Sequence, residues 1–227
     1  MTSGPEPRSI RDSSLPSAPA GPRERLAAAV RSLLDTVLTV DADGAAVDEA
    51  AETTEAVVAR LRARGRRRDG WSARARRHED YLPRSPALGA LHPSAPPLAW
   101  RVRDGRFVAE GTLGAAFEGP PGYVHGGWVA LLFDEALGVA NVAGGDPGMT
   151  ARLHVRYRRP TPLHAPLRLE AWTTGRQGRR ITTAGTLHAG PTLCAEAEGL
   201  FVDIGADRAL EYFGERPAVP DPVDPLP

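Results

Sequence analysis

Hydrophobic and polar residues alternate along much of the chain from residue 98 to residue 203. Two alternating stretches, LAWRV and RFVAEGTL, flank Asp104-Gly105, a dipeptide typical of a two-residue β-hairpin turn. Four more β-rich stretches follow, MTARLHVRY, PLRLEAWTT, RRITTAGTLH and TLCAEAEGLFV, and short turn-like sequences separate them. The pattern predicts six strands, of which the last four form an antiparallel sheet.

The segment GPPGYVHGGWVALLFDEALGVANVA, residues 119–143, lies between the second and third predicted strands. After His125, apolar side chains occupy every angular position of a helical projection, which predicts a buried helix. The helix is too short, and too interrupted by Asp134, Glu135 and Gly138, to span a membrane. We expect it to lie across the concave face of the sheet. A sheet wrapped around one long helix is the hotdog architecture, so the predicted fold class is α+β with a hotdog fold.

The N-terminal part has a helical period instead. Apolar residues recur every three or four positions between Pro22 and Val40, and a second helix is predicted from Val47 to Arg64. Nine arginines fall between Arg60 and Arg77. We therefore divide the chain into a disordered tail (1–22), a helical extension with an Arg-rich linker (23–80), a proline-rich connector (81–97), the hotdog domain (98–205) and a C-terminal tail (206–227).

Composition narrows the function classes. The formal net charge is zero, and no recognition motif accompanies the arginine run, so no nucleic-acid partner is expected. Cys194 is the single cysteine of the sequence, which excludes an internal disulfide and a cysteine-cluster metal site. The histidines outside the helix entrance have no carboxylate at metal-ligand spacing, so no metal is expected. The first thirty residues lack a signal-peptide pattern, and we expect a cytoplasmic protein with no membrane span.

The segment GYVHGGWVALLFDEALG, the strand MTARLHVRYRRPTPL and the dipeptide Gly178-Arg179 together resemble one known family. They are similar to the PaaI-type branch of hotdog-fold acyl-CoA thioesterases, over roughly residues 95–203. The shared features are HGG at the helix entrance, an acidic residue nine positions after the histidine, a threonine opening the next strand and a YxxP sequence. The resemblance implies an enzyme that hydrolyses acyl-CoA without a cofactor, coenzyme A being part of the substrate.

The resemblance also implies roles for individual residues. Gly126 would offer its backbone N–H to the thioester carbonyl, and Asp134 would be the general base or the nucleophile. Thr150 would hold Asp134 or the attacking water, and His125 would shape the turn. Candidates for contacts with the substrate and the coenzyme A phosphates are Gly127, Arg158, Arg159 and Arg179.

Helix geometry adds a constraint on these roles. Eight residues of helix place Gly126 and Asp134 about 12 Å apart. Reacting atoms lie within about 3–3.5 Å of their catalytic groups, so one chain does not present both residues to one carbonyl. We therefore predict a two-fold homodimer, or a dimer of dimers, with active sites at the interface.

Several alternatives stay open at this point. Glu135 is a rival to Asp134 as the base, but one residue is about 100° of helix, so only one of the two carboxylates points at a given site. Either could instead form a salt bridge to an arginine, and His125 could itself be the base. The chain could also be a non-catalytic acyl-CoA-binding protein. A hotdog hydratase is disfavoured because no histidine follows Asp134 five residues later.

Overall fold

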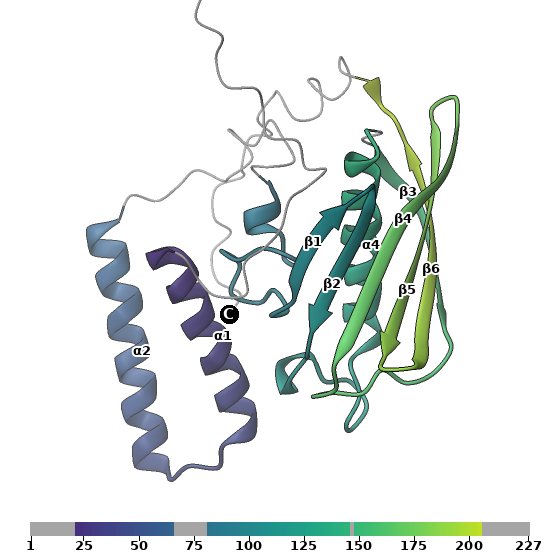
Figure 1. Ribbon diagram of the computed structural model, residues 1–227. Coiled ribbons are helices and arrows are strands. Elements are labelled where there is room, and N and C mark those ends of the chain that lie inside the picture. Colours follow the sequence, from purple (N-terminus) through teal and green to yellow (C-terminus); the bar gives the residue numbers. More distant parts are fainter. Residues whose placement is uncertain (1–20, 66–80, 146–147, 206–227) are drawn as a thin grey trace, which may run out of the picture.

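The computed structural model describes residues 21–65, 81–145 and 148–205. Its centre is a six-stranded antiparallel sheet with the strand order β1-β2-β4-β5-β6-β3 (Figure 1). The strands are β1 (Ala99–Arg103), β2 (Arg106–Gly111), β3 (Met149–Tyr157), β4 (Leu167–Gln177), β5 (Arg180–Ala189) and β6 (Thr192–Val202). Asp104 and Gly105 connect β1 to β2 with positive φ angles of 52° and 71°, as the predicted hairpin turn requires.

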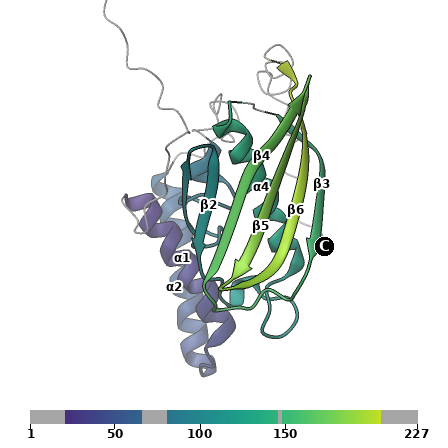
Figure 2. The same ribbon diagram turned by 45° about the vertical axis from the view of Figure 1, so that its right-hand side comes forward.

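Helix α4 (Gly126–Ala143) lies across one face of this sheet, and the sheet curves around it (Figure 2). The helix contributes Val129, Leu132, Phe133, Leu137 and Val139 to the core, each almost completely buried. The predicted element order and the hotdog fold are confirmed. Strand β3 follows α4 in the chain, yet among the described strands it pairs only with β6, so it forms one edge of the sheet.

Two strand glycines let α4 approach the sheet closely. A side-chain carbon on Gly199 would lie 2.6 Å from atoms of both Phe201 and Thr183 and 3.2 Å from Leu137 of α4. One on Gly185 would lie 3.3 Å from the Phe133 ring. The helix therefore rests on backbone at these two positions, which leaves no room for a larger residue.

Two helices precede the sheet: α1 (Pro22–Thr39) and α2 (Gly44–Arg64). Arg31 of α1 donates hydrogen bonds to the backbone oxygens of Ala95, at 2.6 Å, and His92, at 3.1 Å. A carboxylate oxygen of Asp35 accepts a hydrogen bond of 3.0 Å from the Ala115 N–H, at the start of the short helix η4 (Ala115–Phe117). Helix α1 is thus fixed to the body at two places, whereas α2 buries no residue.

Residues 81–97 begin with the short helix η3 (Leu82–Arg84) and pack into the core. Ala87, Leu88 and Ala95 are at most 1% exposed, and the backbone oxygen of Leu88 accepts a hydrogen bond from the Trp100 indole. This proline-rich segment therefore contributes to the folded body as well as connecting to it.

The predicted tails, 1–22 and 206–227, lie outside the described residues except at Gly21 and Pro22, and so does the arginine run beyond Gly65. Within the described part of the chain, no helix combines the length and the apolar character needed to cross a bilayer.

We predict that Gly199→Ala lowers the free energy of unfolding by about 1–3 kcal/mol, because the added methyl overpacks the contact between α4 and the sheet. Gly175→Ala is the matched control, since its added carbon would meet only the Thr182 hydroxyl, at 3.5 Å. Urea unfolding of both variants checks this. Equal stabilities would show that the helix does not rest on the Gly199 backbone.

Candidate active site

The entrance to α4 is a turn fixed by several hydrogen bonds. His125 is the N-cap residue, and its ring Nδ1 accepts a hydrogen bond of 2.9 Å from the Gly127 N–H. Its backbone N–H donates to the Phe117 oxygen at 2.9 Å, and the Tyr157 hydroxyl donates to the Gly126 oxygen at 2.9 Å. These contacts give His125 a cap role at the turn, and Tyr157, the tyrosine of the YxxP sequence, also holds the turn, a role that the sequence had not assigned to it.

The first two backbone N–H groups of α4 differ in whether they have a hydrogen-bond acceptor. The N–H groups of the first helical turn lack acceptors within the helix, and the N-terminus carries about half a positive charge. His125 occupies the Gly127 N–H. Among the described residues, the Gly126 N–H has no hydrogen-bond acceptor. Gly126 is therefore the amide of this turn that is available to polarise a carbonyl oxygen.

Asp134 lies two turns further along α4 and contacts strand β3. Its Oδ1 accepts a hydrogen bond of 3.0 Å from the Thr150 hydroxyl. The structure thus brings Asp134 and Thr150 together, and it places them beside the edge strand. Asp134 is half-buried in the single chain, although the apolar pattern predicted a buried helix around it.

The buried carboxylate is that of Glu135, which is 8% exposed. It accepts a hydrogen bond of 2.7 Å from the Tyr81 hydroxyl. Burial raises the pKa of Glu135, and hydrogen bonds with Tyr81 and Ser85 oppose that rise. Both partners come from the proline-rich segment, which has no periodicity that could have indicated them. Glu135 therefore ties this segment to α4.

The three candidate arginines do not lie together in one chain. Arg158 and Arg156 both pair with Glu196, and Arg159 lines a cavity beside them. Arg179 donates to the backbone oxygen of Asp203, beside the end of β6 that pairs with the start of β3. Arg158 follows the opposite end of β3, so the length of the strand separates it from Arg179.

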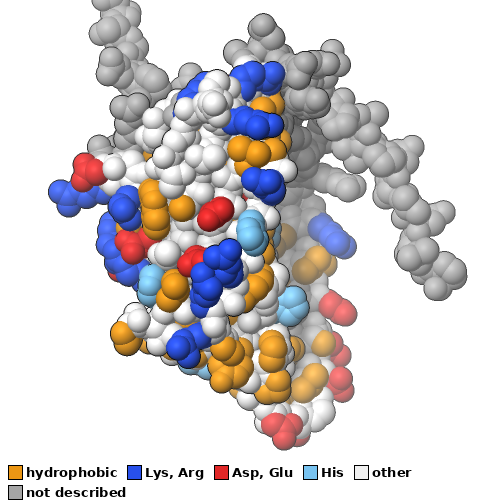
Figure 3. Space-filling view, turned by 90° about the vertical axis from the view of Figure 1, so that its right-hand side faces the viewer, with side chains coloured by type: hydrophobic (Ala, Val, Ile, Leu, Met, Phe, Trp, Pro, Cys, Tyr) orange, Lys and Arg blue, Asp and Glu red, His pale blue; other side chains and the backbone are white. Residues whose placement is uncertain are grey.

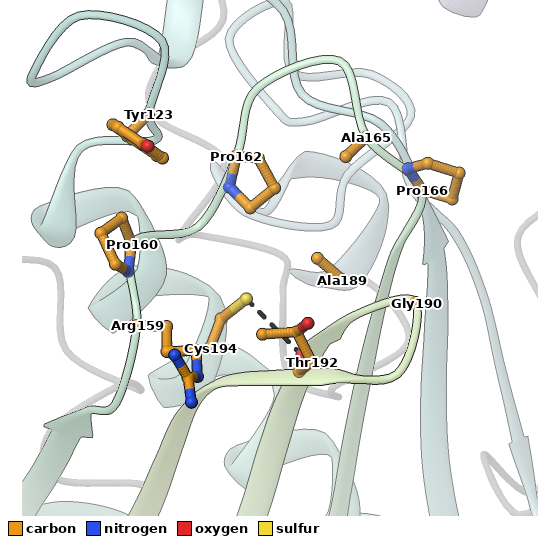
Figure 4. Close-up of a pocket in the computed structure, with 10 residues that line it drawn as sticks. All are labelled: Tyr123, Arg159, Pro160, Pro162, Ala165, Pro166, Ala189, Gly190, Thr192 and Cys194. Atoms are coloured by element: carbon orange, nitrogen blue, oxygen red, sulfur yellow. Dashed lines mark hydrogen bonds between the residues drawn. The ribbon is translucent and has the colours of Figure 1, made fainter.

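The cavity next to Arg159 has a volume of about 470 Å³ (Figure 4). Apart from Arg159, its lining includes Tyr123, Cys194 and three prolines, Pro160, Pro162 and Pro166. Backbone hydrogen bonds from Val124 to Thr161 and from Leu163 to Gly122 join its wall to the turn before α4. The cavity is therefore adjacent to the helix entrance.

The face that carries β3 is shown in Figure 3. Basic, acidic and histidine side chains are interspersed over its centre, and hydrophobic side chains gather in the lower half of the view.

No group of three histidine, cysteine, aspartate or glutamate side chains in residues 21–65, 81–145 or 148–205 is arranged to hold a metal ion.

Fold and site together define a hotdog protein of the thioesterase type, and comparisons with known proteins agree. The family model described as "Thioesterase superfamily" matches residues 121–195. A crystal structure described as a thioesterase superfamily protein is 36% identical, with a TM-score of 0.77, over 86% of this chain and 98% of that chain. The chain belongs to the thioesterase superfamily.

Curated relatives match a shorter region. Acyl-coenzyme A thioesterase THEM4 of Mus musculus is 30% identical over 99 residues, which are 43% of this chain and 43% of the relative. The protein of the same name from Xenopus laevis is 33% identical over 93 residues, or 40% of this chain and 42% of the relative. The chain spans less than half the length of these relatives.

We predict that Glu135→Gln changes how stability depends on pH. The folded-state pKa of Glu135 lies above its ordinary value of 4.5, so protonation of Glu135 stabilises the folded protein. This contribution to the free energy of unfolding is fully present below pH 4.5 and is lost as the pH rises through the raised pKa. Glutamine keeps an acceptor for Tyr81 but does not titrate. The stability of the variant relative to wild type should therefore increase with pH.

Urea unfolding of both proteins between about pH 4 and pH 8 measures this difference. Parallel stability curves would contradict the raised pKa.

Proposed function

We propose that the protein hydrolyses acyl-CoA thioesters to a free acid and coenzyme A. The observation that carries this proposal is the pairing of Asp134 with Thr150 beside a free sheet edge, on the helix that begins with the unengaged Gly126 amide. Membership of the superfamily and the acyl-coenzyme A thioesterase name of the THEM4 relatives support thioester hydrolysis as the reaction class.

The site we propose is completed by a second copy of the chain. Gly126 and Asp134 belong to one unbroken helix, so about 12 Å separates them along its axis. A carbonyl carbon bound at the Gly126 amide therefore needs the carboxylate of another chain within reach. A two-fold dimer provides two equivalent sites, each with the helix entrance of one copy and Asp134 of the other.

Strand β3 is the surface that we propose for this dimer. Among the described strands it pairs only with β6, and most of its side chains are exposed in the single chain, including Met149 at 48% and Tyr157 at 53%. An unpaired edge presents free N–H and C=O groups that another strand can satisfy. Because Thr150 lies on β3 and holds Asp134, edge pairing would bring a second copy next to the candidate carboxylate.

The proposed chemistry uses groups already in place. The Gly126 N–H, at the positive end of the α4 dipole, would stabilise the oxyanion that forms on the carbonyl oxygen. Either Asp134 removes a proton from a water that attacks the carbon, or Asp134 attacks it and forms an anhydride that water then opens. In both routes the C–S bond breaks and coenzyme A leaves as the thiolate, which takes up a proton.

Arg159 is the first candidate for the coenzyme A phosphates, because it lines the cavity next to the helix entrance and Arg158 is engaged by Glu196. Antiparallel pairing of two β3 strands would bring Arg179 of the second copy to the same end of the site. Gly127, whose N–H is occupied by His125, would shape the entrance. We propose the cytoplasm as the location, with which the free Cys194 is compatible.

We predict that Asp134→Asn lowers turnover by about 10²–10⁴-fold, because the amide neither accepts a proton nor attacks the carbonyl. The matched control is Glu135→Gln, which removes the adjacent carboxylate and should keep turnover near the wild-type value. Release of free thiol from a panel of short, long and aromatic acyl-CoA substrates measures both.

Two outcomes would count against the enzyme assignment. Acyl-CoA binding by the wild type without thiol release would indicate a non-catalytic binding protein. Loss of turnover in Glu135→Gln, with Asp134→Asn unaffected, would assign the chemistry to Glu135.

A further inference from the structure

Helix α2 is an amphipathic helix whose apolar side is not covered by any other described part of the chain. None of its 21 residues is buried, and Figure 1 shows it on the outer side of α1, away from the sheet. Its exposed apolar residues include Val47 at 53%, Val57 at 39%, Val58 at 41% and Leu61 at 53%. Isolated helices in water are marginal, and most of their stability in proteins comes from packing an apolar face.

The spacing of these residues is that of a seam between helices. At about 100° per residue, one side of α2 carries a continuous row that we call the α2 stripe. The α2 stripe consists of Val47, Ala50, Ala51, Thr54, Val57, Val58 and Leu61. Apolar or small residues thus recur at alternating three- and four-residue steps over two heptads, the pattern by which a second helix packs along the first.

Charges beside the stripe specify the direction of the partner. The first half of α2 is acidic, with Asp48, Glu49, Glu52 and Glu55, and the last turns are basic, with Arg60, Arg62 and Arg64. A parallel copy would place like charges side by side. An antiparallel copy places the acidic half of each helix along the basic half of the other, which favours that arrangement.

We infer that α2 binds α2 of a second copy of this chain, antiparallel, about a two-fold axis near Thr54. On one flank of the stripe Asp48 then lies opposite Arg62 of the second copy. On the other side Glu49 faces Arg60 of the second copy across a wider gap, since both lie roughly 120–140° around the helix from the middle of the stripe, and symmetry repeats both pairs. Glu55 lies opposite the equivalent glutamate of the second copy, at the solvent-exposed edge of the stripe. Water and salt there screen the repulsion between the two carboxylates.

This interface is separate from the catalytic proposal. Helix α2 lies beyond the β1 end of the sheet and β3 forms the opposite edge (Figure 1). Helix α1 also exposes Val37 at 70% and Leu38 at 62%. The helices α1 and α2 of a second copy could cover this apolar surface as well. The α2 pair therefore joins two copies, or two β3 dimers, without using the active-site face.

A charge-swap series tests the inference. The double variants Arg60→Glu/Arg62→Glu and Asp48→Arg/Glu49→Arg each place like charges opposite one another in all four of these pairs. We expect the molar mass of each, measured by sedimentation velocity on the full chain, to be about half that of wild type. An equimolar mixture of the two variants restores opposite charges in every pair and should recover the wild-type mass.

Glu52→Arg is the control, because Glu52 points furthest from the stripe and faces no charged residue of the second copy, so its reversal should leave the mass unchanged. Wild type and both double variants with the same mass would overturn the inference, and so would a mixture that does not recover. Thiol release per chain should be unchanged throughout the series. If the wild type released no thiol while the molar masses still changed as expected across the series, the proposed function would be wrong and the α2 pair would stand.

Discussion

The packing of helix α4 against the sheet is the contact on which the rest of the structure depends. Phe133 and Leu137 pack where Gly185 and Gly199 expose strand backbone, so one side of the helix is fixed against the sheet. A rigid helix has a fixed rise, which holds the Gly126 amide and the Asp134 carboxylate about 12 Å apart. The feature that makes a stable single-chain core is thus the feature that requires a second chain for the proposed chemistry.

The two adjacent carboxylates of α4 show how a rotation of about 100° around the helix separates two tasks. Glu135 points under the proline-rich segment, where Tyr81 binds it and burial raises its pKa. Asp134 points to the other side, where Thr150 on the free edge strand donates to it. One group therefore holds the molecule together, and the other lies on a surface that a substrate and a partner can reach.

Periodicity in the sequence was sufficient to predict the six strands and the central helix. The family motif offered two roles for Thr150, and the hydrogen bond to Asp134 corresponds to one of them. The sequence was not sufficient to place β3 at the edge beside β6, because strand order depends on pairing between distant residues. The burial of residues 81–97 was also missed. Tyr81 and Ser85 take their roles from contacts with Glu135, and no local pattern in a proline-rich segment reports such contacts.

The most direct test of the central claim combines two inactive variants. Gly126→Pro removes the amide hydrogen at a helix position that accepts proline, after a residue whose ψ of 132° suits it. Each of Gly126→Pro and Asp134→Asn alone should be inactive. Refolded together in equal amounts, they should recover about one quarter of wild-type turnover, because half of the dimers are mixed and each mixed dimer has one intact site. No recovery in dimers shown to be mixed would mean that the amide and the carboxylate do not act across two chains.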